Sequence, residues 1–290
     1  MRRALLAVPF LLLGVGLRSS LSGPDPAPPP PPRSAEEAAT RVLEARAKND
    51  GPALAVLAAL REPDPYLVAS ALFGRALSAT GAETRRPAFE AAAAFADVAR
   101  DNPSAAGLAR LVTTWAGLDD AGIERERVMR AGLADGTAAL AAKDPAKALA
   151  RVKGLEAAMA GASWSLTPVQ LRQLEAQALS AAGRAPQDEP VLEAAAQAAE
   201  ALGWRLGAVQ TWNRLAGAAF QRGDVEKSLA SLRRAVELAK AADAAAPLAR
   251  MRPNLVRALA RAGLGREALV VAKVAVHDAA SAPGGTPLAS

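Results

Sequence analysis

Apolar residues recur at helical spacing along most of the chain after Ser34, and short breaks interrupt them at a regular distance. The breaks fall near residues 63, 103, 143, 183, 223 and 263, so each step is 40 residues. A fixed period of this size is typical of stacked helical hairpins. The pattern predicts an all-α domain over residues 34–282: one leading helix, then about six stacked antiparallel helical hairpins in a right-handed α-solenoid.

The clearest unit is TWNRLAGAAFQRGDVEKSLASLRRAVELA, residues 211–239. Its first half has apolar residues on one helical face, and Gly223 follows as a helix-ending glycine. Asp224 is a favourable first cap for the next helix, and Arg222 suits the last turn of the helix before it. These preferences account for the Arg-Gly-Asp tripeptide at 222–224, so we interpret it as a turn and not as a cell-adhesion motif.

This unit resembles a tetratricopeptide repeat. The matching residues are Trp212, Leu215, Ala216, Gly223, Leu232 and Ala235, whereas Ser228 stands where alanine is usual. NLVRALARAGLGREALVVAKVAV (254–276) repeats the pattern, and KDPAKALARVKGLEAA (143–158) does so more weakly. The resemblance covers roughly residues 122–282, with a repeat of about 40 residues where about 34 is usual. PQDEP (186–190) departs from the pattern and predicts a longer turn. The resemblance implies peptide binding in a groove lined by the first helices.

Polar residues beside the apolar stripe of three first helices are the candidate partner-binding residues. They are Gln170, Gln173, Gln177, Gln210, Asn213, Gln221, Arg250, Asn254, Arg257 and Arg261. Amides that grade into arginines suit an extended peptide backbone and a carboxylate. The set lacks the full carboxylate-clamp pattern of the family, and the alternative is a plain solvated face.

Composition supports helices with a thin core. Hydrophobic residues make up 51% of the 290 residues but aromatic residues only 3%, so alanine and leucine supply most of the apolar surface. Alanine has the highest helix propensity, and β-branched and aromatic residues favour strands. We expect the four tryptophans to be core anchors, with a place in a ligand groove as the alternative.

The first 22 residues have the pattern of a signal peptide. Two arginines precede an apolar run, Ala4–Leu17, which is too short to span a bilayer comfortably. We expect cleavage after Ser22, with an uncleaved membrane anchor or a cytoplasmic chain as alternatives. Residues 23–33 are predicted to form a proline-rich polyproline II linker, and residues 283–290 a disordered tail.

Charge and residue types argue against several classes of function. The net charge is +6, and without Arg2, Arg3 and Arg18 it is 32 basic against 29 acidic residues, too small an excess for a typical nucleic-acid binder. The chain has no cysteine and one histidine, His277. We therefore expect no disulfide, no metal site, no cofactor and no enzymatic activity.

The sequence thus favours an exported, periplasmic or extracytoplasmic scaffold that binds a protein or peptide, with a place in envelope assembly. We expect membrane contact only through an uncleaved N-terminal segment. Two alternatives stay open: a self-associating structural component of the envelope, and a cytoplasmic regulator with the same repeats. Homo-oligomers are compatible with each.

Overall fold

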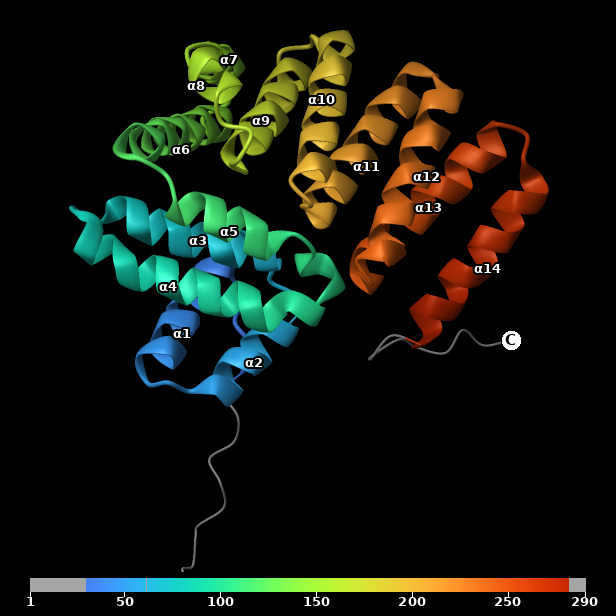
Figure 1. Cartoon of the computed structure of the whole chain (residues 1–290). Helices are drawn as coiled ribbons and strands as arrows, with labels where there is room; N and C mark the ends of the chain where they lie inside the picture. The colour runs from blue at the N-terminus through green and yellow to red at the C-terminus, as the bar shows by residue number, and fades with distance from the viewer. Residues whose placement is uncertain (1–29, 61, 282–290) are drawn as a thin grey trace, which may run out of the picture. The chain divides into compact units, whose positions relative to one another are not determined.

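The structure, a computed structural model, describes residues 30–60 and 62–281 (Figure 1). The chain divides at Pro31 into two units, and every described helix belongs to the second. Residues 1–22, most of the 23–33 linker and the 283–290 tail lie outside the described residues. Within the described ranges the secondary structure is fourteen α-helices and three 3-10 turns, with no strand. The predicted all-α class is confirmed.

The helices fall into two groups along the chain. The first group is α1 (Ala35–Ala47), α2 (Gly51–Ala59), α3 (Pro65–Ser78), α4 (Ala82–Val98) and α5 (Leu108–Ala116). The second group is α6 (Asp120–Ala141), α7 (Pro145–Lys153), α8 (Glu156–Ala160), α9 (Thr167–Ala181), α10 (Asp188–Ala201), α11 (Arg205–Arg222), α12 (Val225–Ala241), α13 (Ala245–Arg261) and α14 (Gly265–Ser281). The 3-10 turns are Ala99–Asp101, Pro103–Ala105 and Ala185–Gln187.

The helix breaks lie where the 40-residue period predicts them. Each of the six expected positions falls between helices. Gly183, Gly223 and Gly263 have φ values of 70°, 85° and 75°, in the left-handed region that closes a helix most easily with glycine. Asp224 accepts a hydrogen bond from the Lys227 backbone N at 3.0 Å and so caps α12. The interpretation of 222–224 as a helix-to-helix turn is confirmed.

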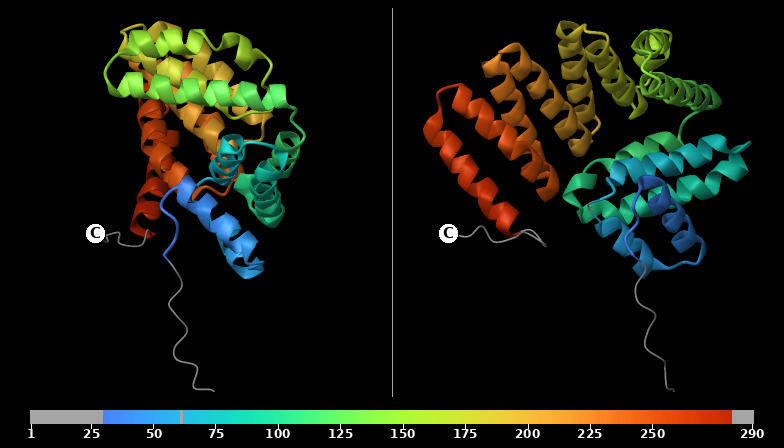
Figure 2. Two further views of the ribbon diagram at one scale, coloured as in Figure 1. Left: turned by 90° about the vertical axis from the view of Figure 1, so that its left-hand side faces the viewer. Right: turned by 180° about the vertical axis from the view of Figure 1, so that it is seen from behind.

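Consecutive helices pack as pairs in the second group. The pairs α6/α7, α9/α10, α11/α12 and α13/α14 each pack together and follow one another in chain order (Figure 2). Each second helix also packs on the first helix of the next pair: α7 on α9, α10 on α11, and α12 on α13. The connection between α9 and α10 contains the 3-10 turn Ala185–Gln187, but α10 already begins at Asp188, so the longer turn predicted at 186–190 is wrong for residues 188–190.

The first group departs from the expected arrangement. The prediction of one leading helix before the hairpins is wrong, since α1 pairs with α2 and also packs against α3 and α4. The breaks at 63 and 103 lie between helix pairs, whereas those at 143 to 263 lie within pairs. The turns inside α1/α2 and α3/α4 are instead at Asn49 and Gly81, which have positive φ. The extra helix α5 at the end of the first group changes which breaks lie within pairs, while the 40-residue spacing of the breaks is kept.

The tryptophans contribute to the core unequally. Trp115 is buried and stacks on Phe73, with ring centroids 4.7 Å apart. Trp204 is also buried, whereas Trp164 and Trp212 are partly buried and pack against the core. One continuous apolar cluster reaches from α1 to α13, so the two groups of helices share a core.

A buried polar contact joins the start of α3 to the turn between α10 and α11. Asp64 accepts hydrogen bonds from Trp204 Nε1 at 2.7 Å and from the Tyr66 backbone N at 2.9 Å. The Tyr66 hydroxyl donates to the carbonyl oxygens of Ala106, at 2.5 Å, and Leu202, at 3.3 Å. We call this contact the Asp64–Trp204 junction. It ties residues 140 positions apart in the sequence.

A second buried cluster holds α6 against α9 and α3. Glu126 is fully buried and accepts hydrogen bonds from Ser165 Oγ and Thr167 Oγ1, both at 2.6 Å, and from Arg130 Nε at 2.7 Å. Arg130 also donates to the Ser70 carbonyl oxygen at 3.0 Å. The carboxylate is therefore paired and hydrogen-bonded, as a buried charge must be.

None of the described helices is both long enough and apolar enough to cross a membrane.

We expect Gly203→Ala to destabilise the fold more than Gly183→Ala. Both residues have positive φ, but an added Cβ at Gly203 would lie 2.7 Å from the Ala106 carbonyl oxygen, while at Gly183 it would meet nothing within 4 Å. Backbone strain alone predicts a loss of about 1 kcal/mol at Gly183, and strain plus the clash a loss of about 2–4 kcal/mol at Gly203. Urea unfolding of both variants measures this, and equal losses would contradict the close packing at the junction.

Asp64 should make stability depend on pH. Burial raises the pKa of Asp64 from its ordinary value of 3.8 to about 6, against the opposing hydrogen bonds from Trp204 and Tyr66. The folded state then binds a proton more tightly than the unfolded state, so the free energy of unfolding falls as pH rises from about 4 to 6. The expected loss is of order 2–3 kcal/mol. Urea unfolding of wild type and Asp64→Asn across this pH window isolates the contribution of Asp64, because the contributions of the other carboxylates are the same in both proteins. A difference between the two proteins that does not change with pH would contradict the assignment.

Candidate functional site

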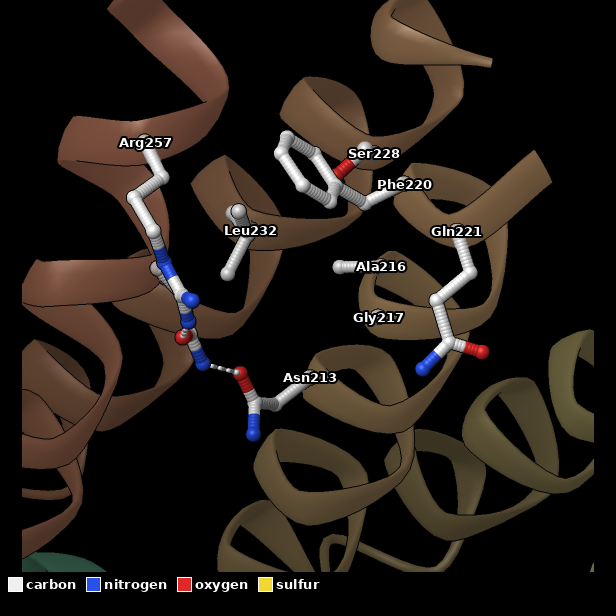
Figure 3. Close-up of a pocket in the computed structure, with 9 residues that line it drawn as sticks. Asn213, Ala216, Gly217, Phe220, Gln221, Ser228, Leu232 and Arg257 are labelled. Carbon is white, nitrogen blue, oxygen red and sulfur yellow. Dashed lines mark hydrogen bonds between the residues drawn. The ribbon is translucent and has the colours of Figure 1, made fainter. Parts of the chain in front are cut away.

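Two adjoining pockets flank α11. The first, which we call the Arg257 pocket, has a volume of about 300 Å³ (Figure 3). Its lining residues come from α11, α12 and α13 and are Asn213, Ala216, Gly217, Phe220, Gln221, Ser228, Leu232, Asn254 and Arg257. The second, the Gln173 pocket, has a volume of about 530 Å³. It is lined from α9, α10 and α11 by Gln173, Ala176, Gln177, Ser180, Asp188, Leu192, Arg214, Gly217, Ala218, Gln221 and Arg222.

Six of the ten candidate residues line these pockets. Gln173 and Gln177 line the Gln173 pocket, Asn213, Asn254 and Arg257 line the Arg257 pocket, and Gln221 belongs to both. The other four, Gln170, Gln210, Arg250 and Arg261, line neither pocket. The structure thus brings a subset together around α11, and their role in binding stays a prediction.

Side chains that donate hydrogen bonds form the rim of the Arg257 pocket. Asn254 Nδ2 donates to Asn213 Oδ1 at 3.3 Å, and Arg257 Nη2 donates to Asn254 Oδ1, so α11 and α13 are linked at the rim (Figure 3). Among the described residues nothing accepts a hydrogen bond from Asn213 Nδ2. The rim therefore offers N–H donors to a ligand with carbonyl or carboxylate oxygens.

The interior of the Arg257 pocket is mostly apolar. Phe220, Leu232 and Ala216 form its walls, and the Arg261 guanidinium lies over the Phe220 ring, 5.1 Å from its centroid. Arg261 therefore supports a wall from outside the pocket by a cation–π contact. The Ser228 side chain is 1% exposed, and no described residue is a hydrogen-bond partner for its Oγ.

In the Gln173 pocket the predicted glutamine is held by an internal hydrogen bond. Gln173 Nε2 donates to Thr211 Oγ1 at 2.6 Å, and Thr211 Oγ1 donates to the Gly207 carbonyl oxygen at 2.7 Å. The Gln173 side-chain nitrogen is thus engaged within the fold, and the side-chain oxygen of Gln173 can accept a hydrogen bond from a ligand.

Carboxylates near the pockets are paired with cations. Arg222 lies 3.3 Å from Asp188, and burial raises the pKa of Asp188 while Arg222 opposes the shift. The hydrogen bond from Lys227 lowers the pKa of Glu189, and the same bond raises the pKa of Lys227. Asp188 and Glu189 therefore form ion pairs with Arg222 and Lys227, and they do not neutralise the charge of the other arginines of the site.

Charge is sorted by helix around the pockets. α11 carries three arginines and α13 four, and neither contains an acidic residue. α10 carries four acidic residues and no basic one. Its Glu189, Glu193 and Glu200 pair with bases of α11 and α12. Arg214 and Arg257 form no ion pair within the described residues, so the pocket side of α11 and α13 is positive.

Sequence reasoning missed three features of the site. Gly217 and Arg214 were not selected, although a glycine inside a helical pattern is itself a signal of packing or function. Ser228 was recognised only as a departure from the alanine usual in the repeat. Each of these residues lines a pocket built from helices that only the tertiary structure brings together.

The described residues contain no group of three or more His, Cys, Asp or Glu side chains arranged to hold a metal ion. His277 lies in α14, and its side chain lies outside what the structure describes. The pockets beside α11 combine N–H donors and positive charge with apolar walls. These groups can bind a ligand that carries carbonyl or carboxylate oxygens.

We expect the two buried hydroxyls of the site to have opposite effects on stability. Ser228→Ala removes a buried hydroxyl without a partner, so the free energy of unfolding should rise by about 1 kcal/mol. Thr211→Val removes one that both donates and accepts, and should cost about 1–2 kcal/mol. Urea unfolding measures whether each variant gains or loses stability. A loss of stability in Ser228→Ala would show that the wild-type hydroxyl has a hydrogen-bond partner.

No protein-family model matches the chain, and a search of curated proteins also finds no match.

Proposed function

We propose that this protein is a non-catalytic scaffold whose helix pairs form a right-handed α-solenoid similar to tetratricopeptide repeats, and that it binds an extended acidic peptide segment beside α11. The observation that carries the proposal is the charge of the two first helices. α11 and α13 hold seven arginines and no acid, and they border a pocket lined by the amides of Asn213 and Asn254 and by the guanidinium of Arg257.

The composition of the rim favours peptide over other ligands. Asn213, Asn254 and Gln221 present amides, which match the alternating donors and acceptors of an extended backbone. Arg257 and Arg214 supply charge for carboxylates, and arginine forks suit that geometry. The partly apolar walls at Phe220 and Leu232 give a side chain of the peptide area to bury.

We further propose that the chain is exported and acts in envelope assembly. This part rests on the signal-peptide pattern of residues 1–22 and the proline-rich segment that follows. A stiff linker would separate the helical domain from a membrane or from the cleavage site.

A second candidate function is self-association through α14. Leu269 and Val276 are 58% and 51% exposed, while Leu229 and Val236, 40 residues earlier on α12, pack in the cluster with α13. The face that α12 packs against α13 is therefore exposed to solvent on α14. In this second candidate function, a second copy of the chain covers that face.

Selection of random dodecapeptides displayed on phage against the full chain tests the proposed function. We expect enriched peptides to be rich in Asp and Glu, and their affinity to fall roughly tenfold or more in the Asn213→Ala, Arg257→Ala double variant. Arg266→Ala, an exposed arginine of α14 outside both pockets, is the control and should bind as wild type. Higher salt should weaken binding.

Two results would contradict this function. One is the absence of any enriched peptide; the other is enrichment of peptides that bind the double variant as tightly as wild type. If peptides fail and sedimentation shows concentration-dependent dimers that Leu269→Glu abolishes, self-association replaces peptide binding.

A further inference from the structure

Large apolar side chains are exposed mainly in the first pair of helices and in the last described helix, α14 (Figure 1). Eight such side chains are exposed in the part of the chain that the structure describes. Six of them lie on α2, on α14 or in the turn before α14: Val56, Leu264, Leu269, Val270, Val274 and Val276. The terminal helices of repeat domains commonly carry a polar outer face, and grouped apolar residues at a surface mark an interaction site. The distribution therefore points to contacts made by the two ends.

On α14 the exposed face continues an interface that is already present inside the fold. α12 packs the corresponding face, with Leu229 and Val236, against α13. The equivalent residues 40 positions later are Leu269 and Val276, which are exposed. The nine residues 282–290 are too few to supply another helix pair, which takes about 40 residues in such a repeat. A helix from a second copy of the same fold therefore suits this face.

The helix α2 also has an exposed apolar face. None of its nine residues has a polar side chain, and one side of the helix, which includes Leu54, is already buried in the fold. The exposed residues recur at i, i+3, i+4 and i+7, and they are Pro52, Ala55, Val56 and Ala59. This is the spacing of the apolar stripe that a helix normally buries. We call these four residues the α2 face, and we call Leu269, Val270, Val274 and Val276 the α14 face.

Charge favours a contact of α14 with α2 over a contact of α14 with itself. Lys273 is exposed, lies midway along α14, and is surrounded in the sequence by the residues of the α14 face. A symmetric contact centred on that face would place it beside Lys273 of the second copy, where like charges repel. α2 has no charged side chain, and the exposed residues just before it carry both signs: Glu44, Arg46, Lys48 and Asp50. The α2 end therefore does not repel Lys273.

We propose that copies of this chain associate head to tail, with the α14 face of one copy packed against the α2 face of the next. The contact is asymmetric, so a dimer keeps one free α2 face and one free α14 face and can add further copies. This inference rests on the second candidate function, self-association through α14, and adds the surface that the second copy supplies. It does not depend on peptide binding.

Two variants of the full chain each block one end. Val270→Glu puts a charge on the α14 face and Val56→Glu puts one on the α2 face. The wild-type side chains are 63% and 65% exposed, so both variants should keep the wild-type Tm. In sedimentation velocity, wild type should form assemblies that grow with concentration, and each variant alone should associate at least roughly tenfold more weakly. Val128→Glu, at an exposed valine of α6, is the matched control and should assemble as wild type.

An equal mixture of the two blocked variants tests the asymmetry. The Val56→Glu chain keeps an intact α14 face, and the Val270→Glu chain keeps an intact α2 face. These two faces can still pack together, while the other two ends of the pair are blocked. The mixture should therefore form dimers with one copy of each variant, and no larger assembly.

The outcomes separate the inference from the functions beneath it. If wild type assembles but the mixture stays monomeric, the head-to-tail contact is overturned. If Val56→Glu assembles as wild type and Val270→Glu does not, a contact of α14 with itself replaces it, and self-association through α14 stands. If wild type is monomeric at every concentration, self-association and the inference both fail, whereas peptide binding is decided separately by the phage selection.

Discussion

The buried carboxylate of Asp64 is the constraint on which the arrangement of the helices depends. A carboxylate withdrawn from water must find donors, and here they come from Trp204 and from the backbone at Tyr66. Because Trp204 stands immediately before α11, this hydrogen bond fixes the first turn of that helix against the start of α3. The pockets flank α11 further along its length. A contact made for stability therefore also sets the position of the candidate site.

The distribution of charge follows from how the helices are paired. The charged residues of α10 are all acidic. They form ion pairs with Arg222 of α11 and with Lys227 and Arg234 of α12. α11 and α13 contain no acidic residue of their own, and within the described residues Arg214 and Arg257 form no ion pair. The near-neutral balance of the whole domain thus hides a local positive surface, and that surface is the basis for proposing an acidic peptide.

Two glycines differ in how far the fold accounts for them. Gly203 has a positive φ and lies against the Ala106 carbonyl oxygen and the Tyr66 hydroxyl, so the fold itself accounts for it. Gly217 has an ordinary helical backbone with open space beside it, so the fold does not. Gly217 lowers the stability of α11 relative to alanine, and no close contact in the described structure requires a residue without a Cβ there.

The sequence alone determined the elements and their ends, because helical periodicity, capping residues and turn glycines act within a few residues of one another. The six breaks, the cap at Asp224 and the turn at Gly223 follow from such local preferences. So do six of the eighteen residues that line the two pockets, among them Gln173, Asn213 and Arg257, which were identified from helix faces. Tertiary structure decided the rest. The pairing of α1 with α2, the contact between Asp64 and Trp204, and the burial of Ser228 depend on residues far apart in the chain, and no local pattern encodes which distant helix supplies the partner.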